Sequence, residues 1–338
     1  MLLCKQGRLL TALEGDGELA ARVCAELETL AIKDGTPQLR IRLVDDASAN
    51  GFEYRAEDGD PVGVDVRCRV PEGVVSHLPE PLARFLNWNY LAPRDKVAKN
   101  FIYDVFDHLC QVVQLRLGQS YLHASAFCKR GRGVALVAEG GVGKTTSVLK
   151  FVLEGGWSYL GDDLVALDED GTLWRTPKRM QIYGYNLEGQ AALQQRLLAD
   201  RTPADRLSWA WHRRRGGHRV RRRVAAADLL GADAIADSAT VSDVIYLERG
   251  TGDAFSCEPV SADALAQRAA ETLLDELAPL AELIEARAAV ILPGAEEFLE
   301  RTKGVLSRGM ANATTRRVTI PAAATPDALY EYLCAELA

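Results

Sequence analysis

The chain has 338 residues, of which 48% are apolar and 26% are charged, the balance of an ordinary globular protein with a sizeable core. Its net charge of −7 excludes a general attraction to nucleic acid or to an anionic membrane surface. The seven cysteines are scattered and form no CxxC pair, so neither a disulfide framework nor a zinc site is expected.

Neither a membrane span nor a secretory leader is expected. No apolar run approaches the ~18 residues of a membrane-spanning helix, and the opening MLLCKQGRLL is too short an apolar run for a signal peptide. Together with the unpaired cysteines, this favours a cytoplasmic protein with no membrane partner. The length suggests two domains, and the patterning places their boundary after residue 118.

Residues 1–118 are expected to form an α+β accessory or substrate domain. Apolar residues recur at helical spacing in three stretches and alternate in two others. Phe101, Tyr103 and Phe106 lie in the longest helical stretch, and we expect them in the core rather than in a ligand site. The predicted elements are a helix at 19–30, strands at 39–44 and 62–70, and helices at 81–91 and 95–117.

Strands dominate the pattern from 119 to about 250. The stretches 121–127 and 133–137 are expected to be neighbouring strands joined by the polar turn 129–132. A polar, Arg-rich insertion occupies about 190–223. Further short strands are predicted at 157–160, 164–167, 173–174, 180–183 and 244–247.

The C-terminal part of the second domain, about 260–338, is mainly helical. Alanine-rich segments there are good helix formers, and Pro321 should end a short strand at 316–320. Helices are predicted at 262–285, at 295–308 and from Pro326 onward.

A glycine-rich loop joins the strand at 133–137 to an amphipathic helix and reads AEGGVGKTT. Strand, glycine loop and helix are the context of a phosphate-binding P-loop, in which backbone N–H groups converge on phosphate oxygens. Lys144 can then reach the β- and γ-phosphates of ATP, and the Thr145 hydroxyl can ligate Mg²⁺. Ala138 replaces the usual first glycine, and a plain glycine-rich turn is the alternative. The predicted nucleotide-binding residues are Glu139, Gly140, Gly141, Val142, Gly143, Lys144, Thr145 and Thr146.

Two adjacent carboxylates, Asp162 and Asp163, follow the strand at 157–160, where an open α/β sheet presents residues to its ligand. One carboxylate can hold Mg²⁺ while the other accepts the proton of an attacking hydroxyl. The alternative is a solvated turn. His123 lies 21 residues before Lys144, either as a buried core histidine or in contact with the γ-phosphate or a carboxylate.

Basic residues are concentrated between 211 and 223. Three interpretations remain open: a solvated mobile loop, a patch for an acidic partner, and a lid that clamps phosphate. Nucleic acid is not expected as a partner, because aromatic residues are not interleaved with the basic ones. Lys178 and Arg179 could pair with phosphate or lie in solvent.

This loop and the residues around it resemble those of two families. EGGVGKTT is similar to the loop of the ParA/MinD partitioning ATPases, but their signature lysine is replaced by Glu139, and their loop opens the chain. The histidine spacing and the sequence Gly161-Asp162-Asp163-Leu164-Val165 resemble the HPr kinase/phosphorylase group, which is related to phosphoenolpyruvate carboxykinase. That resemblance covers about 119–250.

The resemblance to the HPr kinases implies an α/β P-loop kinase domain with a mixed sheet at 119–338. It implies Asp162 as the catalytic base, with His123 and Lys144 also catalytic, and Asp163 beside the metal. Gln181 stands where that family has a metal-associated glutamate, and an active-site arginine corresponds to one of Arg221, Arg222 and Arg223.

A kinase that transfers the γ-phosphoryl group of ATP to a hydroxyl is therefore the predicted function. The acceptor would be a serine-type side chain of a peptide or protein, or a small molecule, and HPr itself is not expected. The loop lacks the family's G-x-S-G-x-G-K-S-E sequence. A regulatory ATPase or GTPase without an acceptor is the alternative, and a carboxykinase-like enzyme is a weaker one. The family is hexameric, and for this chain a homo-oligomer is left open.

Overall fold

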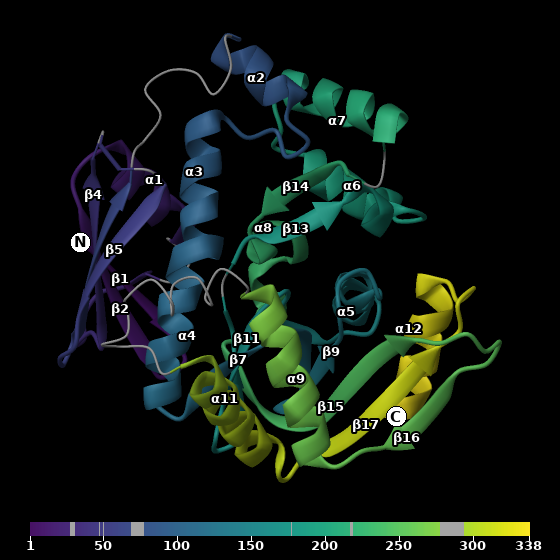
Figure 1. Ribbon diagram of the computed structural model, residues 1–338. Coiled ribbons are helices and arrows are strands. Elements are labelled where there is room, and N and C mark those ends of the chain that lie inside the picture. The colour runs from purple at the N-terminus through teal and green to yellow at the C-terminus, as the bar shows by residue number, and fades with distance from the viewer. Residues whose placement is uncertain are drawn as a thin grey trace. The chain divides into compact units, whose positions relative to one another are not determined.

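The fold was analysed in a computed structural model, which describes all residues except 28–30, 47, 50, 69–77, 177, 217–218 and 278–293. The described chain is a mixed α/β protein (Figure 1). None of its described helices is both long enough and apolar enough to cross a membrane. Its contacts divide it into two compact units, each of which draws on separate stretches of the chain: unit 1 (1–4, 11–107 and 177–231) and unit 2 (5–10, 108–176 and 232–338). Because the units interleave along the chain, a domain boundary at residue 118 stays a prediction.

A six-stranded sheet and the helices beside it form much of unit 1. Strand β4 (Leu39–Asp45) alternates buried and exposed residues, as predicted, because one face of the sheet packs on the core. Helix α1 (Glu18–Leu27) buries Leu19, Val23 and Leu27. The strand order is β3 (Ala31–Ile32), β1 (Leu2–Gln6), β2 (Leu9–Gly15), β4, β6 (Val62–Cys68) and β5 (Phe52–Glu57).

The helix predicted at 95–117 is present but changes its winding. It begins as α3 (Pro93–Phe101), continues through a π-helical segment η2 (Ile102–Phe106) and ends as α4 (Asp107–Arg116). Phe101 and Phe106 are buried as expected, whereas Tyr103 is half-buried.

The Arg-rich insertion is helical between two paired strands. Strand β13 (Met180–Tyr183) pairs with β14 (Arg221–Val224) in an antiparallel two-stranded sheet. The expectation of a mobile loop is wrong for the described residues up to Gly216, because they are wound into helices. The intervening elements are η3 (Gly184–Leu187), α6 (Ala191–Leu198) and α7 (Pro203–Gly216), and α8 (Ala226–Leu230) follows β14.

A nine-stranded mixed sheet organises unit 2. Its long strand β15 (Ser238–Arg249) runs parallel to both β9 (Arg132–Val137) and β17 (Thr314–Ile320). β16 (Ser256–Pro259) pairs with β17. The main order is β10 (Ser158–Gly161), β8 (Ala124–Lys129), β9, β15, β12 (Thr172–Trp174), β11 (Val165–Asp168) and β7 (Gln119–Leu122).

The single strand predicted at 121–127 is wrong. The chain bends at His123 and forms two strands that lie far apart in the strand order, since β7 pairs with β11 while β8 pairs with β9 and β10. Both strands are buried on both faces, so no change in hydrophobic period marks the bend. The predicted hairpin of β8 with β9 is confirmed.

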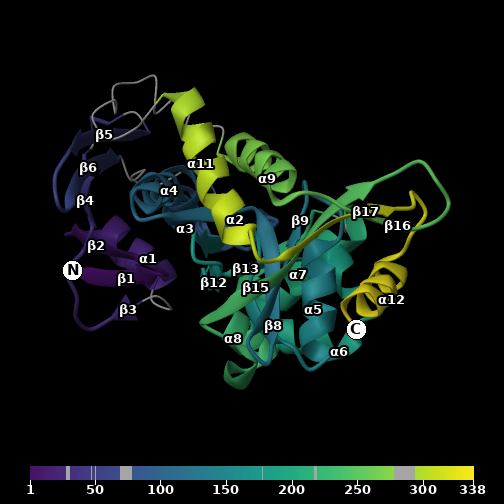
Figure 2. The ribbon, with the colours of Figure 1, turned by 90° about the horizontal axis from the view of Figure 1, so that it is seen from below.

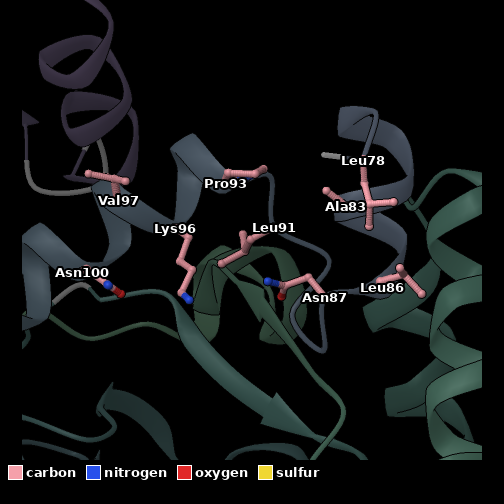
Figure 3. A pocket seen from close by; sticks show the side chains of 9 residues that line it. All are labelled: Leu78, Ala83, Leu86, Asn87, Leu91, Pro93, Lys96, Val97 and Asn100. Atoms are coloured by element: carbon pink, nitrogen blue, oxygen red, sulfur yellow. The ribbon is translucent and has the colours of Figure 1, made fainter. Parts of the chain in front are cut away.

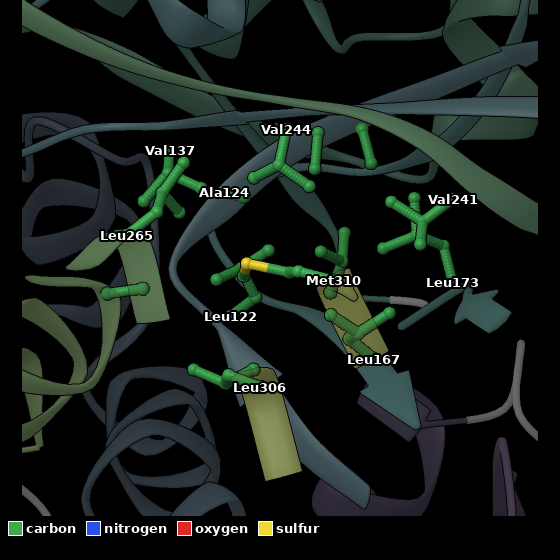
Figure 4. Close-up of a cluster of buried hydrophobic side chains, with 14 of the residues drawn as sticks. Leu122, Ala124, Val137, Leu167, Leu173, Val241, Val244, Leu265, Leu306 and Met310 are labelled. Atoms are coloured by element: carbon green, nitrogen blue, oxygen red, sulfur yellow. The ribbon is translucent and has the colours of Figure 1, made fainter. Parts of the chain in front are cut away.

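Helices cover both faces of this sheet. α9 (Ala262–Glu276) and α11 (Ala295–Met310) lie side by side in Figures 1 and 2. Figure 4 shows Leu265, Leu306 and Met310 from these helices against side chains of the strands. On β8 the alternate residue Phe127 stacks instead on Phe151 of α5 (Lys144–Leu153), with ring centroids 4.3 Å apart. α12 (Pro326–Leu337) packs beside α5. The predicted end of the helix at 262–285 lies outside the described residues.

Candidate functional site

The glycine-rich loop lies between β9 and α5, as the sequence predicts. β9 ends at Val137, α5 begins at Lys144, and Gly143 is the residue that precedes the helix. Gly141 and Gly143 have φ angles of +79° and +112°, in the left-handed region that side chains with a Cβ rarely adopt. The first backbone N–H groups of α5 have no partner within the helix, so the loop ends at a local concentration of positive charge.

Lys144 folds back on the loop. Its ammonium group donates to the backbone oxygens of Ala138 and Glu139, the latter at 3.1 Å. Burial lowers the pKa of Lys144 to about 8, although Asp162 and Asp163 act in the opposite direction. A phosphate oxygen offers this ammonium a stronger, charged acceptor than the two carbonyls.

Asp162 lies directly after β10 and is hydrogen-bonded to the first turn of α5. The Thr145 hydroxyl donates to its carboxylate, with Oγ1 lying 2.9 Å from Oδ2 and 3.1 Å from Oδ1. The Ser125 hydroxyl of β8 donates to the same carboxylate. Burial raises the pKa of Asp162 above its usual value, in part offset by these hydroxyls.

Asp163 adopts a left-handed backbone conformation with a φ of +77°. A non-glycine residue pays for this conformation in steric strain, which is common where a side chain must be aimed at a ligand. Its predicted part in holding a metal stays a prediction.

His123 lies at the bend between β7 and β8 and is buried. The next residue, Ala124, pairs with Val137, the last residue of β9, so the bend is close to the start of the loop. The His123 Nε2 atom lies 3.8 Å from a carboxylate oxygen of Glu276 at the end of α9. The histidine is therefore near the loop, as the sequence predicts, but in a bend rather than in a strand.

Ser125, which donates to Asp162, is a site residue that the sequence did not indicate. It lies on β8, two residues after the bend at His123. The serine by itself carried no signal, because its carboxylate partner is 37 residues away.

Gln181 and the three arginines belong to unit 1. The Gln181 amide donates to the Tyr103 hydroxyl at 3.0 Å, and on β14 Arg223 is its strand partner. The predicted metal role of Gln181 stays a prediction. Lys178 forms an ion pair with Asp107 at 2.6 Å and its side chain is only 8% exposed, so it is not a solvated surface lysine.

The loop residues suit Mg²⁺ bound together with a nucleotide. No cluster of three His, Cys, Asp or Glu side chains that could hold a metal occurs among the residues described. Mg²⁺ in nucleotide sites needs only one or two protein oxygens, since phosphates and water supply the rest. Thr145 and the two carboxylates offer oxygens of that kind.

A groove of about 440 Å³ lies in unit 1 beside α2 (Glu80–Leu86) and α3 (Figure 3). Leu78 and Leu86, which line it, are 40% and 47% exposed. The lining is mostly apolar and comprises Leu78, Ala83, Leu86, Asn87, Leu91, Pro93, Lys96, Val97 and Asn100.

Comparisons with known proteins give little beyond these features. No protein-family model matches the chain. No curated protein matches it either. Among solved structures, the chain is similar to the HPr(Ser) kinase/phosphatase from Coxiella burnetii, at 11% sequence identity and a TM-score of 0.31, over 64% of this chain and 96% of that one.

Proposed function

We propose that the chain is an ATP-dependent phosphotransferase that acts on a hydroxyl group. The observation that carries the proposal is the hydrogen bond from Thr145 to Asp162. It joins the first turn of the helix after the glycine-rich loop to the carboxylate that follows β10, and in our proposal these parts supply a phosphate cradle, oxygen ligands and a base for phosphoryl transfer.

The phosphate cradle is the loop and the start of α5. Positive φ angles at Gly141 and Gly143 let the backbone turn tightly before the helix. In this proposal the loop N–H groups and the helix N-terminus bind the phosphate oxygens. Lys144 exchanges its contacts with the loop carbonyls for the terminal phosphates of ATP. Its charge then offsets the negative charge of the transferring group.

Thr145 and Asp163 would hold Mg²⁺ beside the phosphates. When bound, Mg²⁺ supplies positive charge that stabilises the leaving phosphate oxygens. Because the Thr145 hydroxyl donates its hydrogen to Asp162, its oxygen lone pairs remain able to ligate a metal.

Asp162 takes the proton of the acceptor. The acceptor O–H bond breaks, the proton passes to the carboxylate, the new O–P bond forms and ADP leaves. A carboxylate whose pKa is raised by burial is a stronger base than an exposed one. Ser125 holds the carboxylate in place, and His123 at the bend is proposed to contact the γ-phosphate or to orient a carboxylate.

Labelled ATP tests this proposal. The wild-type chain, incubated with γ-³²P-ATP and a cell extract, should transfer label to a discrete peptide or metabolite. Asp162→Asn should reduce the transfer by roughly 10²–10⁴-fold, because the base is lost. Its ATP affinity should change little, since the loop is intact. Undiminished transfer by the variant would exclude Asp162 as the base, and label found only as free phosphate would favour a regulatory ATPase.

A further inference from the structure

The three consecutive arginines of β14 have different environments. Arg222 is fully buried, its Nε lies 2.6 Å from Asp205, and its guanidinium lies 5.3 Å from the ring centroid of Trp209. Arg221 and Arg223 point to the opposite face of the strand, since side chains alternate along it. Arg222 therefore has a structural role. Arg221 and Arg223, on the other face of the strand, are free to take a different role.

Cations gather around the ring of Tyr103, in the π-helical segment of unit 1. The ammonium groups of Lys99 and Lys178 lie 4.8 and 4.5 Å from its ring centroid, and the guanidinium of Arg223 lies 5.8 Å away. π-Helical turns are rare and are often found at functional sites, because they displace side chains from their usual positions. In Figure 1 α3 runs beside β13 and β14.

Carboxylates only partly balance these cations. Asp107 pairs with Lys178, and Glu26 is shared by Arg179 at 3.5 Å and Arg223 at 2.9 Å. In the part of the chain that the structure describes, no carboxylate forms an ion pair with Arg221, whose guanidinium lies 5.2 Å from the Tyr183 ring centroid. Asp104 opposes the charge of Lys99 as well, and with this third carboxylate the five cations of the cluster still leave excess positive charge.

Two further observations favour an anion as the ligand of this cluster. The Nε atoms of Arg221 and Arg223 are buried and have no hydrogen-bond partner among the described residues. Buried donors of this kind are normally satisfied. The pKa of Lys99 is lowered first by burial and then by the charges of Arg223 and Arg221, while the Asp104 carboxylate acts in the opposite direction.

We propose that Lys99, Arg221 and Arg223 form a binding site for a phosphate-type oxyanion. The charge of a phosphate dianion matches this excess better than a single carboxylate does, and arginine donors suit its oxygens. The half-buried positions of Lys99 and Arg221 leave the site open to a ligand. The same chemistry could come from free phosphate or from a phosphate monoester on a larger molecule.

Calorimetric titration of the Lys144→Ala chain tests the site while phosphate binding by the loop is weakened. Inorganic phosphate and O-phosphoserine are the probes. We expect at least one to bind, and Arg221→Gln to weaken that binding at least about tenfold, through loss of a charge-assisted hydrogen bond. Tighter binding of phosphoserine would identify a monoester as the ligand, and equal binding would identify the phosphate ion.

The matched control is Arg214→Gln, which removes an exposed arginine of α7 and should leave binding unchanged. Among the described residues Arg221 forms no ion pair with a carboxylate, so Arg221→Gln leaves no buried carboxylate unpaired. An unchanged Tm would confirm that the variant is folded. The proposal is overturned if neither probe binds at millimolar concentration, or if Arg221→Gln binds as tightly as the control. Because the Arg221→Gln and Arg214→Gln variants share the same loop, the difference between them is independent of ATP binding by the loop.

Discussion

At the scale of single residues, the candidate site holds two buried ionisable groups whose pKa values shift in opposite senses. Burial lowers the pKa of Lys144 to about 8 and raises that of Asp162. Both shifts disfavour the charged forms, and such groups are common in sites that bind or transfer charged species. Each shift has a measurable consequence.

Nucleotide binding should take up a proton at mildly alkaline pH. Above about pH 8 the free Lys144 amine loses its proton, whereas bound phosphates favour the charged ammonium. We therefore expect ATP affinity to fall as the pH rises from 8, and calorimetry in buffers of different ionisation enthalpy to detect proton uptake. Lys144→Arg, which stays protonated, should show no uptake in this window. Proton-neutral binding by the wild-type chain at pH 9 would contradict the assignment.

Removing the buried carboxylate should stabilise the protein while strongly reducing transfer. The pKa of Asp162 in the folded state is raised, so the folded state binds the proton more tightly, and stability falls as the pH rises from the unfolded value through the folded one. Asp162→Asn should consequently have a higher Tm than wild type at pH 7, and the difference should vanish in acid. Asp200→Asn, at an exposed position, is the control. A lower Tm for Asp162→Asn at pH 7 would contradict this account.

At the scale of elements, the strand β14 gives different environments to three arginines that are adjacent in the sequence. Three adjacent arginines looked like one basic patch, but alternation sends Arg222 into the core and its neighbours to the other face. The sequence alone could not tell that Arg222 is buried while its neighbours are not in the same environment, because its contacts Asp205 and Trp209 lie on a helix that was not predicted.

Arg222→Leu should cost about 3–5 kcal/mol in the free energy of unfolding, because Asp205 would lose its main partner inside the protein. The double variant with Asp205→Leu should recover most of that loss. Urea unfolding measures both values. A cost below about 1 kcal/mol for the single variant would mean that the buried pair is not essential to unit 1.

The glycine loop is the element that the sequence predicts best. Strand, loop and helix are all present, since hydrophobic period and glycine spacing are local signals. The bend at His123 escaped prediction because β7 and β8 are equally apolar and differ only in their distant partners. The contact from Ser125 to Asp162 likewise depends on the pairing of β8 with β10.

At the scale of the whole molecule, the class of fold could be predicted and its connections could not. The helices predicted at 262–285 and 295–308 are observed at 262–276 and 295–310 among the described residues, and the mixed main sheet agrees with what the resemblance to the HPr kinases implies. The strands β1, β2 and β5 were not predicted. The two units also interleave: residues 177–231 join unit 1 although they follow the glycine loop in sequence. The return of the chain to unit 1 depends on long-range packing, which cannot be predicted from a single sequence.

Calorimetric titration with MgATP tests the central claim most directly. The wild-type chain should bind MgATP, Asp162→Asn should bind it with similar affinity, and Lys144→Ala should bind it about 10–100-fold more weakly, through loss of one charged hydrogen-bond donor. A wild-type chain that binds neither MgATP nor MgGTP, or a Lys144→Ala variant that binds as tightly as wild type, would contradict the assignment of this loop to nucleotide phosphates.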